Sequence, residues 1–314
     1  MDDGRIVVAD AGNYVLRFYN PDGKIIHSVG RQGQGPGEYE NLAWIGACGD
    51  RTVYAWDFVL DRISIIDMHG EFQRSFKLSE ASAITSAIGM RCHKDGTLMV
   101  ASRVIGAPAA LGPHRVKSSI HLLDAHGRIV QDLGEYPGMD RYRYDSSDGP
   151  QPFGKETAYA IGDRVVYVGT ADEYMIQALP VGGTSATQIG RNVERRPITR
   201  RDQTRYIEQR LSRIKDRSQR ERVAQNLRNI QFPDHFPAYR SFIVDQLNNL
   251  WVEQYRTPTD DAARWDVFGP DGMFLGTLTA PAGLEVYQVG AGFILGKWSD
   301  PLDVGFIHLH RIER

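Results

Sequence analysis

The sequence predicts an all-β fold assembled from repeats, and three observations lead to it. Short β-branched runs alternate with turn residues, as in "DGRIVVADAGNYVLRFYNPDGKIIHSVG" at residues 3–30. The same phrase returns at residues 49–76, where Asp57 falls on Asp10. Further copies follow at residues 94–134, 162–190, 248–278 and 291–314. Six units of about forty to fifty residues, each with several strands, indicate a six-bladed β-propeller. Five blades are the alternative, because the terminal repeats could merge.

A glycine-rich segment, "GRQGQGPGEYENL" at residues 30–42, follows the first repeat. A phosphate-binding loop would follow a buried strand and open a helix, so that backbone N–H groups point at the anion. Here the next residues, "LAWIGACGDRTVYAWD", are strand-like and rich in turn residues. The segment is therefore interpreted as a connection between two blades.

The first repeat, "VADAGNYVLRFYNPDGK", together with this connection resembles the NHL-type repeat of six-bladed β-propellers. The chain resembles in particular bacterial propellers that are labelled only as six-bladed, and the resemblance covers most of the chain. The resemblance implies the fold and almost no chemistry. Relatives of this kind are expected to be secreted or periplasmic, with an upstream segment that carries a signal peptide and two further strands. The sequence itself leaves the localisation open.

The composition favours one globular domain over residues 1–314, because 41% of the residues are hydrophobic. No apolar run reaches the roughly eighteen residues of a membrane span. The net charge of −2 argues against nucleic-acid binding. Cys48 and Cys92 have no zinc-binding spacing. They hold matching places in neighbouring repeats, and we interpret them as two free buried thiols.

The terminal repeats are incomplete. By alignment, the first begins at its second strand and the last runs out before its fourth. Exposed strand edges invite pairing with another chain. A homo-oligomer formed through these unpaired terminal strands is therefore an open expectation.

A helical insertion is predicted at residues 197–230, between blades four and five and over the mouth of the propeller. Apolar residues there recur at spacings of three and four, and "SQRE" at residues 218–221 is interpreted as a capping box between two helices. Residues 191–228 carry a net charge of +8, which leaves −10 for the remainder. The insertion is either a lid paired to the body by salt bridges or a docking surface for an anionic ligand or partner.

Long insertions mark one face as the mouth, because loops on a rigid scaffold carry most binding and catalytic residues. These insertions are residues 103–117, 135–156, 191–240 and 256–264. The turns on the opposite face are uniformly short.

Carboxylates and aromatic rings gather at this mouth, a mixture that suits a sugar. We predict a carbohydrate-directed propeller that acts as a glycoside hydrolase, with two carboxylates as acid and as nucleophile or base. The predicted catalytic residues are Glu253, Asp300 and Asp57. Glu253 is the candidate acid because it follows apolar residues. The predicted substrate-binding residues are Trp298, Tyr255, Arg256, Arg103, Asp303 and Asp61.

Two alternatives remain open: a noncatalytic protein- or glycan-recognition propeller, and a metal-dependent lactonase or lyase. The expected ligand is a small molecule or a glycan. No cofactor is expected, and a divalent metal held by mouth carboxylates stays an alternative, although no residues have dedicated metal-ligand spacing. No GxSxG or HExxH motif is present.

Overall fold

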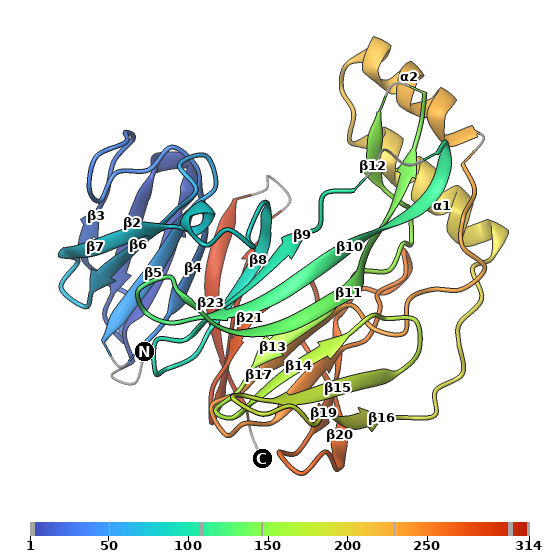
Figure 1. Cartoon of the computed structure of the whole chain (residues 1–314). Coiled ribbons are helices and arrows are strands. Elements are labelled where there is room, and N and C mark those ends of the chain that lie inside the picture. The colour runs from blue at the N-terminus through green and yellow to red at the C-terminus, as the bar shows by residue number, and fades with distance from the viewer. Residues whose placement is uncertain are drawn as a thin grey trace. The chain divides into compact units, whose positions relative to one another are not determined.

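The computed structural model describes residues 4–49, 51–106, 110–145, 147–228, 230–300 and 304–312. Strands in these ranges form six sheets, which matches the six repeats (Figure 1). Within each sheet, strands that follow one another in the chain lie side by side. The first and last sheets have three strands each, so the predicted incompleteness of both terminal repeats is confirmed.

The chain divides into two compact units, and the expectation of a single domain stays a prediction. Unit 1 comprises Met1–Ile105 and Ser119–Glu135, and unit 2 comprises Gly106–Ser118 and Tyr136–Arg314. The first two sheets lie in unit 1. Their strands are β1 (Ile6–Asp10), β2 (Val15–Tyr19) and β3 (Ile25–Val29), then β4 (Leu42–Ala47), β5 (Thr52–Asp57), β6 (Arg62–Asp67) and β7 (Phe72–Lys77).

The third sheet contains two long strands that continue from unit 1 into unit 2. Its strands are β8 (Ala87–Cys92), β9 (Leu98–Arg103), β10 (Gly112–Leu123), β11 (Ile129–Arg143) and β12 (Asp148–Pro150). Parts of residues 103–117 and 135–156, which the sequence predicts to be loops, therefore belong to a long β-ribbon (Figure 1). These residues form strands because pairing in an antiparallel ladder satisfies the backbone N–H and C=O groups of both strands.

Unit 2 holds the last three sheets, in which β13 lies beside β17 and β17 beside β21. The fourth sheet comprises β13 (Ala158–Ile161), β14 (Val165–Gly169), β15 (Met175–Pro180) and β16 (Thr187–Gly190). The fifth comprises β17 (Ser241–Val244), β18 (Leu250–Glu253), β19 (Arg264–Phe268) and β20 (Phe274–Thr279). The sixth comprises β21 (Glu285–Val289), β22 (Phe293–Ser299) and β23 (Gly305–Arg311).

The strands reverse at the predicted turns because the side chain of an aspartate accepts hydrogen bonds from the backbone of the turn. In the β6–β7 hairpin, Asp67 accepts hydrogen bonds from the backbone N–H groups of His69 (2.8 Å) and Glu71 (3.0 Å). Asp124 makes the same two bonds in the β10–β11 hairpin. The following glycine in this second turn, Gly127, has a φ of 81°, which a residue with a Cβ rarely adopts.

The glycine-rich segment joins β3 to β4, so its interpretation as a connection between repeats is confirmed. Glu38 accepts a hydrogen bond from the N–H group of Gly35 (2.8 Å). Arg62, at the start of β6, donates to the carbonyl oxygens of Gln34, Gly35 and Glu38. Backbone groups of this segment are therefore hydrogen-bonded to side chains of the protein itself.

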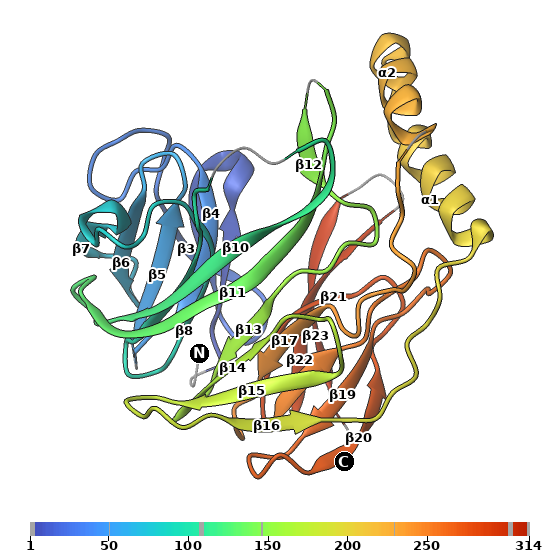
Figure 2. The same ribbon diagram turned by 45° about the vertical axis from the view of Figure 1, so that its right-hand side comes forward.

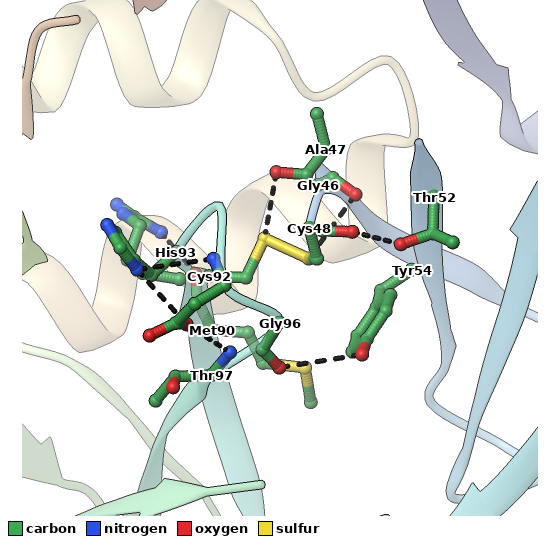
Figure 3. The surroundings of a disulfide bond; sticks show 12 residues. Gly46, Ala47, Cys48, Thr52, Tyr54, Met90, Cys92, His93, Gly96 and Thr97 are labelled. Carbon is green, nitrogen blue, oxygen red and sulfur yellow. Dashed lines mark hydrogen bonds and ion pairs between the residues drawn. A yellow bond between two sulfur atoms is a disulfide. The ribbon is translucent and has the colours of Figure 1, made fainter. Parts of the chain in front are cut away.

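Cys48 and Cys92 form a disulfide, so the interpretation as two free thiols was wrong. The matching places of the two residues bring their Cα atoms to 5.5 Å (Figure 3), within the range that a disulfide bridges. Gly46 makes room for the bond, because a Cβ on this residue would lie 2.8 Å from the sulfur of Cys92. Bonds of this kind persist in oxidising compartments.

The insertion between β16 and β17 forms two helices, α1 (Arg200–Ser212) and α2 (Arg217–Arg228), as predicted (Figure 2). A capping box is present at Thr199 and Asp202, at the start of α1. The one predicted at residues 218–221 was wrong, because Asp216 accepts the N–H of Gln219 (2.7 Å) and places Ser218 inside α2. Neither described helix is long and apolar enough to cross a membrane.

Candidate ligand-binding site

The end of β18 places Glu253 in a buried and strongly hydrogen-bonded position. The "LWVE" strand is buried throughout, and Glu253 is 4% exposed. Its neighbour in the β17–β18 ladder is Ser241, whose hydroxyl donates to Glu253 Oε2 at 2.7 Å. The backbone N–H of Arg240 donates to the carbonyl oxygen of Glu253 at 2.7 Å.

Two arginines converge on this carboxylate. Arg240 Nη1 lies 3.0 Å and Arg256 Nε 3.1 Å from Glu253 Oε1. The arginine side chains are 46% and 29% exposed. Since a guanidinium carries five N–H donors, both arginines keep donor capacity toward solvent. Glu253 thus orients two cations at the end of β18.

A cavity of about 290 Å³ lies beside the end of β18, lined by Arg240, Tyr255, Arg256 and Asp260. The Tyr255 ring packs beside Phe236, with ring centroids 5.5 Å apart. Burial raises the pKa of Tyr255 to about 12, so the phenol is neutral at physiological pH and can donate a hydrogen bond.

A third arginine, Arg196, borders the same site from the segment that leads into α1. Its guanidinium donates to the carbonyl oxygen of Tyr255 and lies 3.6 Å from Asp260. It also lies 5.7 Å from the centroid of the Phe236 ring. Three arginines therefore meet the carboxylates of Glu253 and Asp260 at this site.

Glu156 adds a second glutamate near Arg240. It lies two residues before β13, and Arg240 immediately precedes β17, the strand beside β13. Glu156 is exposed to solvent, yet burial raises its pKa, opposed by the charge of Arg240.

Glu253, Tyr255 and Arg256 are the predicted residues that the structure brings together. Asp57, Asp61 and Arg103 lie in unit 1. Asp57 is fully buried and accepts hydrogen bonds from three backbone N–H groups, those of Glu40, Asn41 and Leu60. Asp61 accepts one from Ser79 at 2.8 Å. Asp57 and Asp61 have a structural role in this geometry, which gives the catalytic assignment of Asp57 no support.

Arg103 ends β9, and its backbone N–H donates to Ser86 at 2.8 Å. In the sixth sheet, the Trp298 ring lies 5.9 Å from the rings of Phe306 and His308. Asp300 accepts the N–H of Val304 at 2.8 Å in the β22–β23 connection. Asp303 lies outside the described residues.

The described ranges contain no cluster of side chains that is arranged to bind a metal ion. No group of three or more His, Cys, Asp or Glu side chains there is arranged to hold an ion. The lactonase or lyase alternative stays a prediction.

Sequence reasoning missed Arg196, Arg240, Glu156 and Asp260 as site residues. Arg240 was detectable, because the hairpin register places Ser241 opposite Glu253 and so puts Arg240 beside that carboxylate. Arg196 and Asp260 come from separate insertions, and no local pattern signals that they meet.

Comparisons with known proteins agree with the six sheets. Residues 1–88 match the model of a family described as 6-bladed beta-propeller, DUF5128. A solved structure from Bacteroides fragilis NCTC 9343 is 14% identical, with a TM-score of 0.53 over 99% of this chain and 88% of that one. A member of the DUF4221 family from Bacteroides vulgatus is 11% identical, with a TM-score of 0.50 over 95% and 86%. No protein of curated function matches the sequence. The chain is a six-bladed β-propeller whose residues 1–88 match the DUF5128 family model.

Proposed function

We propose that the chain binds an acidic saccharide in the cavity at the end of β18. This is the finer form of the carbohydrate-directed function that the sequence predicts. One observation carries the proposal: Glu253 holds Arg240 and Arg256 together on the wall of a cavity that Tyr255 also lines.

The charge of the site favours an anionic ligand. A guanidinium binds a carboxylate or sulfate through two parallel N–H donors, a geometry that a single ammonium cannot supply. The Glu253 contacts fix both arginines before a ligand arrives, which lowers the entropic cost of binding.

The remaining lining residues favour a sugar as the carrier of that acidic group. Tyr255 offers an aromatic ring and a neutral phenol, and Asp260 offers a carboxylate that accepts hydrogen bonds from hydroxyl groups. Few precisely placed polar groups around an aromatic wall are typical of small-molecule sites.

Arg240→Ala is expected to weaken binding of a uronic-acid oligosaccharide by about tenfold to a hundredfold, the usual value of a hydrogen bond to a charged group. Isothermal titration calorimetry would compare this ligand with a neutral oligosaccharide of equal length. Arg217→Ala is the control, since Arg217 lies on α2 with 93% of its side chain exposed. Equal affinity of the wild-type protein for both ligands, or an equal loss in both variants, would contradict the proposal.

Glycoside hydrolysis is the second candidate, and the environments of Glu156 and Glu253 favour it. Three side chains donate to Glu253 and hold its carboxylate in place as a base or nucleophile. Glu156 has a raised pKa near the same arginine. A pair of carboxyl groups can act as acid and as base or nucleophile in glycoside cleavage. Glu156 therefore replaces Glu253 as the candidate acid.

If an acidic aryl glycoside is hydrolysed, Glu156→Gln is expected to lower turnover by roughly a hundredfold or more. The acid must be protonated to protonate the glycosidic oxygen, so wild-type activity should fall as pH rises through a pKa above 4.5, the ordinary value of a glutamate. The melting temperature at pH 7 should not fall, because the fold raises the pKa of this group and so disfavours its charge. Full activity in Glu156→Gln would remove the assignment, and an inert wild-type protein would leave binding as the function.

A further inference from the structure

One face of α1 borders a second cavity, with a volume of about 620 Å³. The lining residues come in pairs that recur every four positions, which places them on the same side of a helix. All of them are exposed to solvent. They are Arg200, Arg201, Thr204, Arg205, Glu208 and Gln209. We call this the α1 cavity, and the cavity at the end of β18 the β18 cavity.

A row of aromatic rings connects α1 to the β18 cavity. The ring centroid of Tyr206, on α1, lies 5.2 Å from that of Phe153. The Phe153 centroid lies 5.0 Å from that of Phe236, which lies 5.5 Å from that of Tyr255. Tyr255 lines the β18 cavity. Because packed aromatic pairs stabilise the elements that carry them, α1 has a defined place beside this cavity.

One short segment, residues 256–260, borders both cavities. Arg256 and Asp260, at its two ends, line the β18 cavity. Between them, the carbonyl oxygen of Pro258 accepts a hydrogen bond from Gln209 Nε2 at 3.5 Å. Gln209 lines the α1 cavity. The two cavities therefore adjoin, and a chain-like ligand bound in one can continue into the other.

The arginines of the α1 cavity have unused hydrogen-bond donors. In the part of the chain that the structure describes, the guanidinium groups of Arg200, Arg201 and Arg205 have no ion pair or hydrogen bond. Glu208 is the one acidic residue in the lining. The two helices and their connection, residues 200–228, contain ten Arg or Lys residues and four Asp or Glu residues. This basic surface is complementary to an anion, which guanidinium groups bind through charge-assisted hydrogen bonds.

We propose that the acidic saccharide is a polyuronate chain, which places one carboxylate in the β18 cavity and further ones in the α1 cavity. This inference rests on the proposed function. A polyuronate repeats its carboxylate along the chain, so a single molecule meets the arginines of both cavities. Thr204, Glu208 and Gln209 offer polar groups for its hydroxyl groups. Binding at one cavity raises the effective concentration of the chain at the other, which strengthens the binding of longer chains.

Isothermal titration calorimetry with a dimer and an octamer of galacturonic acid tests this inference. Arg201→Ala/Arg205→Ala is expected to bind the octamer about tenfold or more weakly than the wild-type protein does, since each lost hydrogen bond is to a charged group. Its affinity for the dimer should stay unchanged, because the β18 cavity is intact. Arg240→Ala should weaken the binding of both oligomers.

Arg217→Ala/Arg220→Ala is the matched control, because it also removes two positive charges, from exposed positions on α2. This variant should keep the wild-type affinity for both oligomers, and circular dichroism melting would show that all variants are folded. Equal losses in the two double variants would mean that only net charge matters, which would overturn the inference. Tighter binding of a polyglutamate peptide with the charge of the octamer would assign the surface to an acidic protein and overturn it too.

The outcomes separate this inference from the proposed function. If Arg240→Ala weakens binding of the dimer while Arg201→Ala/Arg205→Ala binds the octamer as the wild-type protein does, this inference alone is contradicted. If the dimer does not bind, or if Arg240→Ala leaves its affinity unchanged, the proposed function fails and this inference fails with it.

Discussion

Asp266→Ala is expected to lower the free energy of unfolding by about 3–5 kcal/mol, the cost of removing one partner from a buried charged network. Asp266 is 1% exposed in the middle of β19. Four side chains contact its carboxylate: Arg191 (2.9 Å), Tyr174 (2.7 Å), Gln254 (3.0 Å) and Thr277 (2.5 Å). Without the carboxylate these donors lose their common acceptor, and the Tyr174 hydroxyl is itself buried.

Urea unfolding followed by tryptophan fluorescence would measure this loss. Glu221→Ala is the control, because Glu221 pairs with Arg217 on the exposed surface of α2. Such a pair contributes at most about 0.5 kcal/mol. A loss below about 1 kcal/mol in Asp266→Ala, the range of an ordinary surface substitution, would show that the network is not a unit of the core.

Reduction of the Cys48–Cys92 disulfide is expected to lower the free energy of unfolding by about 4 kcal/mol, for a loop of this length. The two cysteines are 44 residues apart in the sequence. Breaking the bond restores conformational freedom to the unfolded chain. Cys48 is fully buried and packs in a core cluster with Met90 and Leu98, so the thiols add little new exposure in the folded state.

This prediction is tested by urea unfolding with and without dithiothreitol. The Cys48→Ala/Cys92→Ala double variant should unfold like the reduced wild-type protein and should not respond to the reductant. If dithiothreitol leaves the wild-type midpoint unchanged while mass spectrometry shows both thiols free, the disulfide does not stabilise the fold.

The fold was predictable because local signals repeat along the chain. Turn residues such as Asp67 and Asp124 recur with the same hydrogen bonds, and alternating β-branched runs lie between them. The two helices were predictable from the spacing of their apolar residues. The full length of the β10–β11 ribbon was not predictable. Its sequence shows no clear alternation of apolar and polar residues, and each of the two strands is extended only because it pairs with the other.

The candidate site was only partly predictable. Glu253, Tyr255 and Arg256 are close in the sequence and follow one strand, so their placement follows from the strand alone. Arg196 reaches them from a separate insertion and Asp260 from four residues beyond Arg256, and such contacts are set by tertiary packing. The disulfide was missed for a related reason: matching repeat positions indicate proximity, but only the folded structure shows that Gly46, which has no Cβ, leaves room for the Cys92 sulfur.

The most direct test of the proposed function is a crystal structure of the protein soaked with a uronic-acid oligosaccharide. We expect the ligand carboxylate within hydrogen-bonding distance of the free N–H groups of Arg240 and Arg256, with the sugar ring beside Tyr255. A ligand held only by the arginines along α1, or an empty cavity at a ligand concentration that saturates binding in solution, would contradict the account.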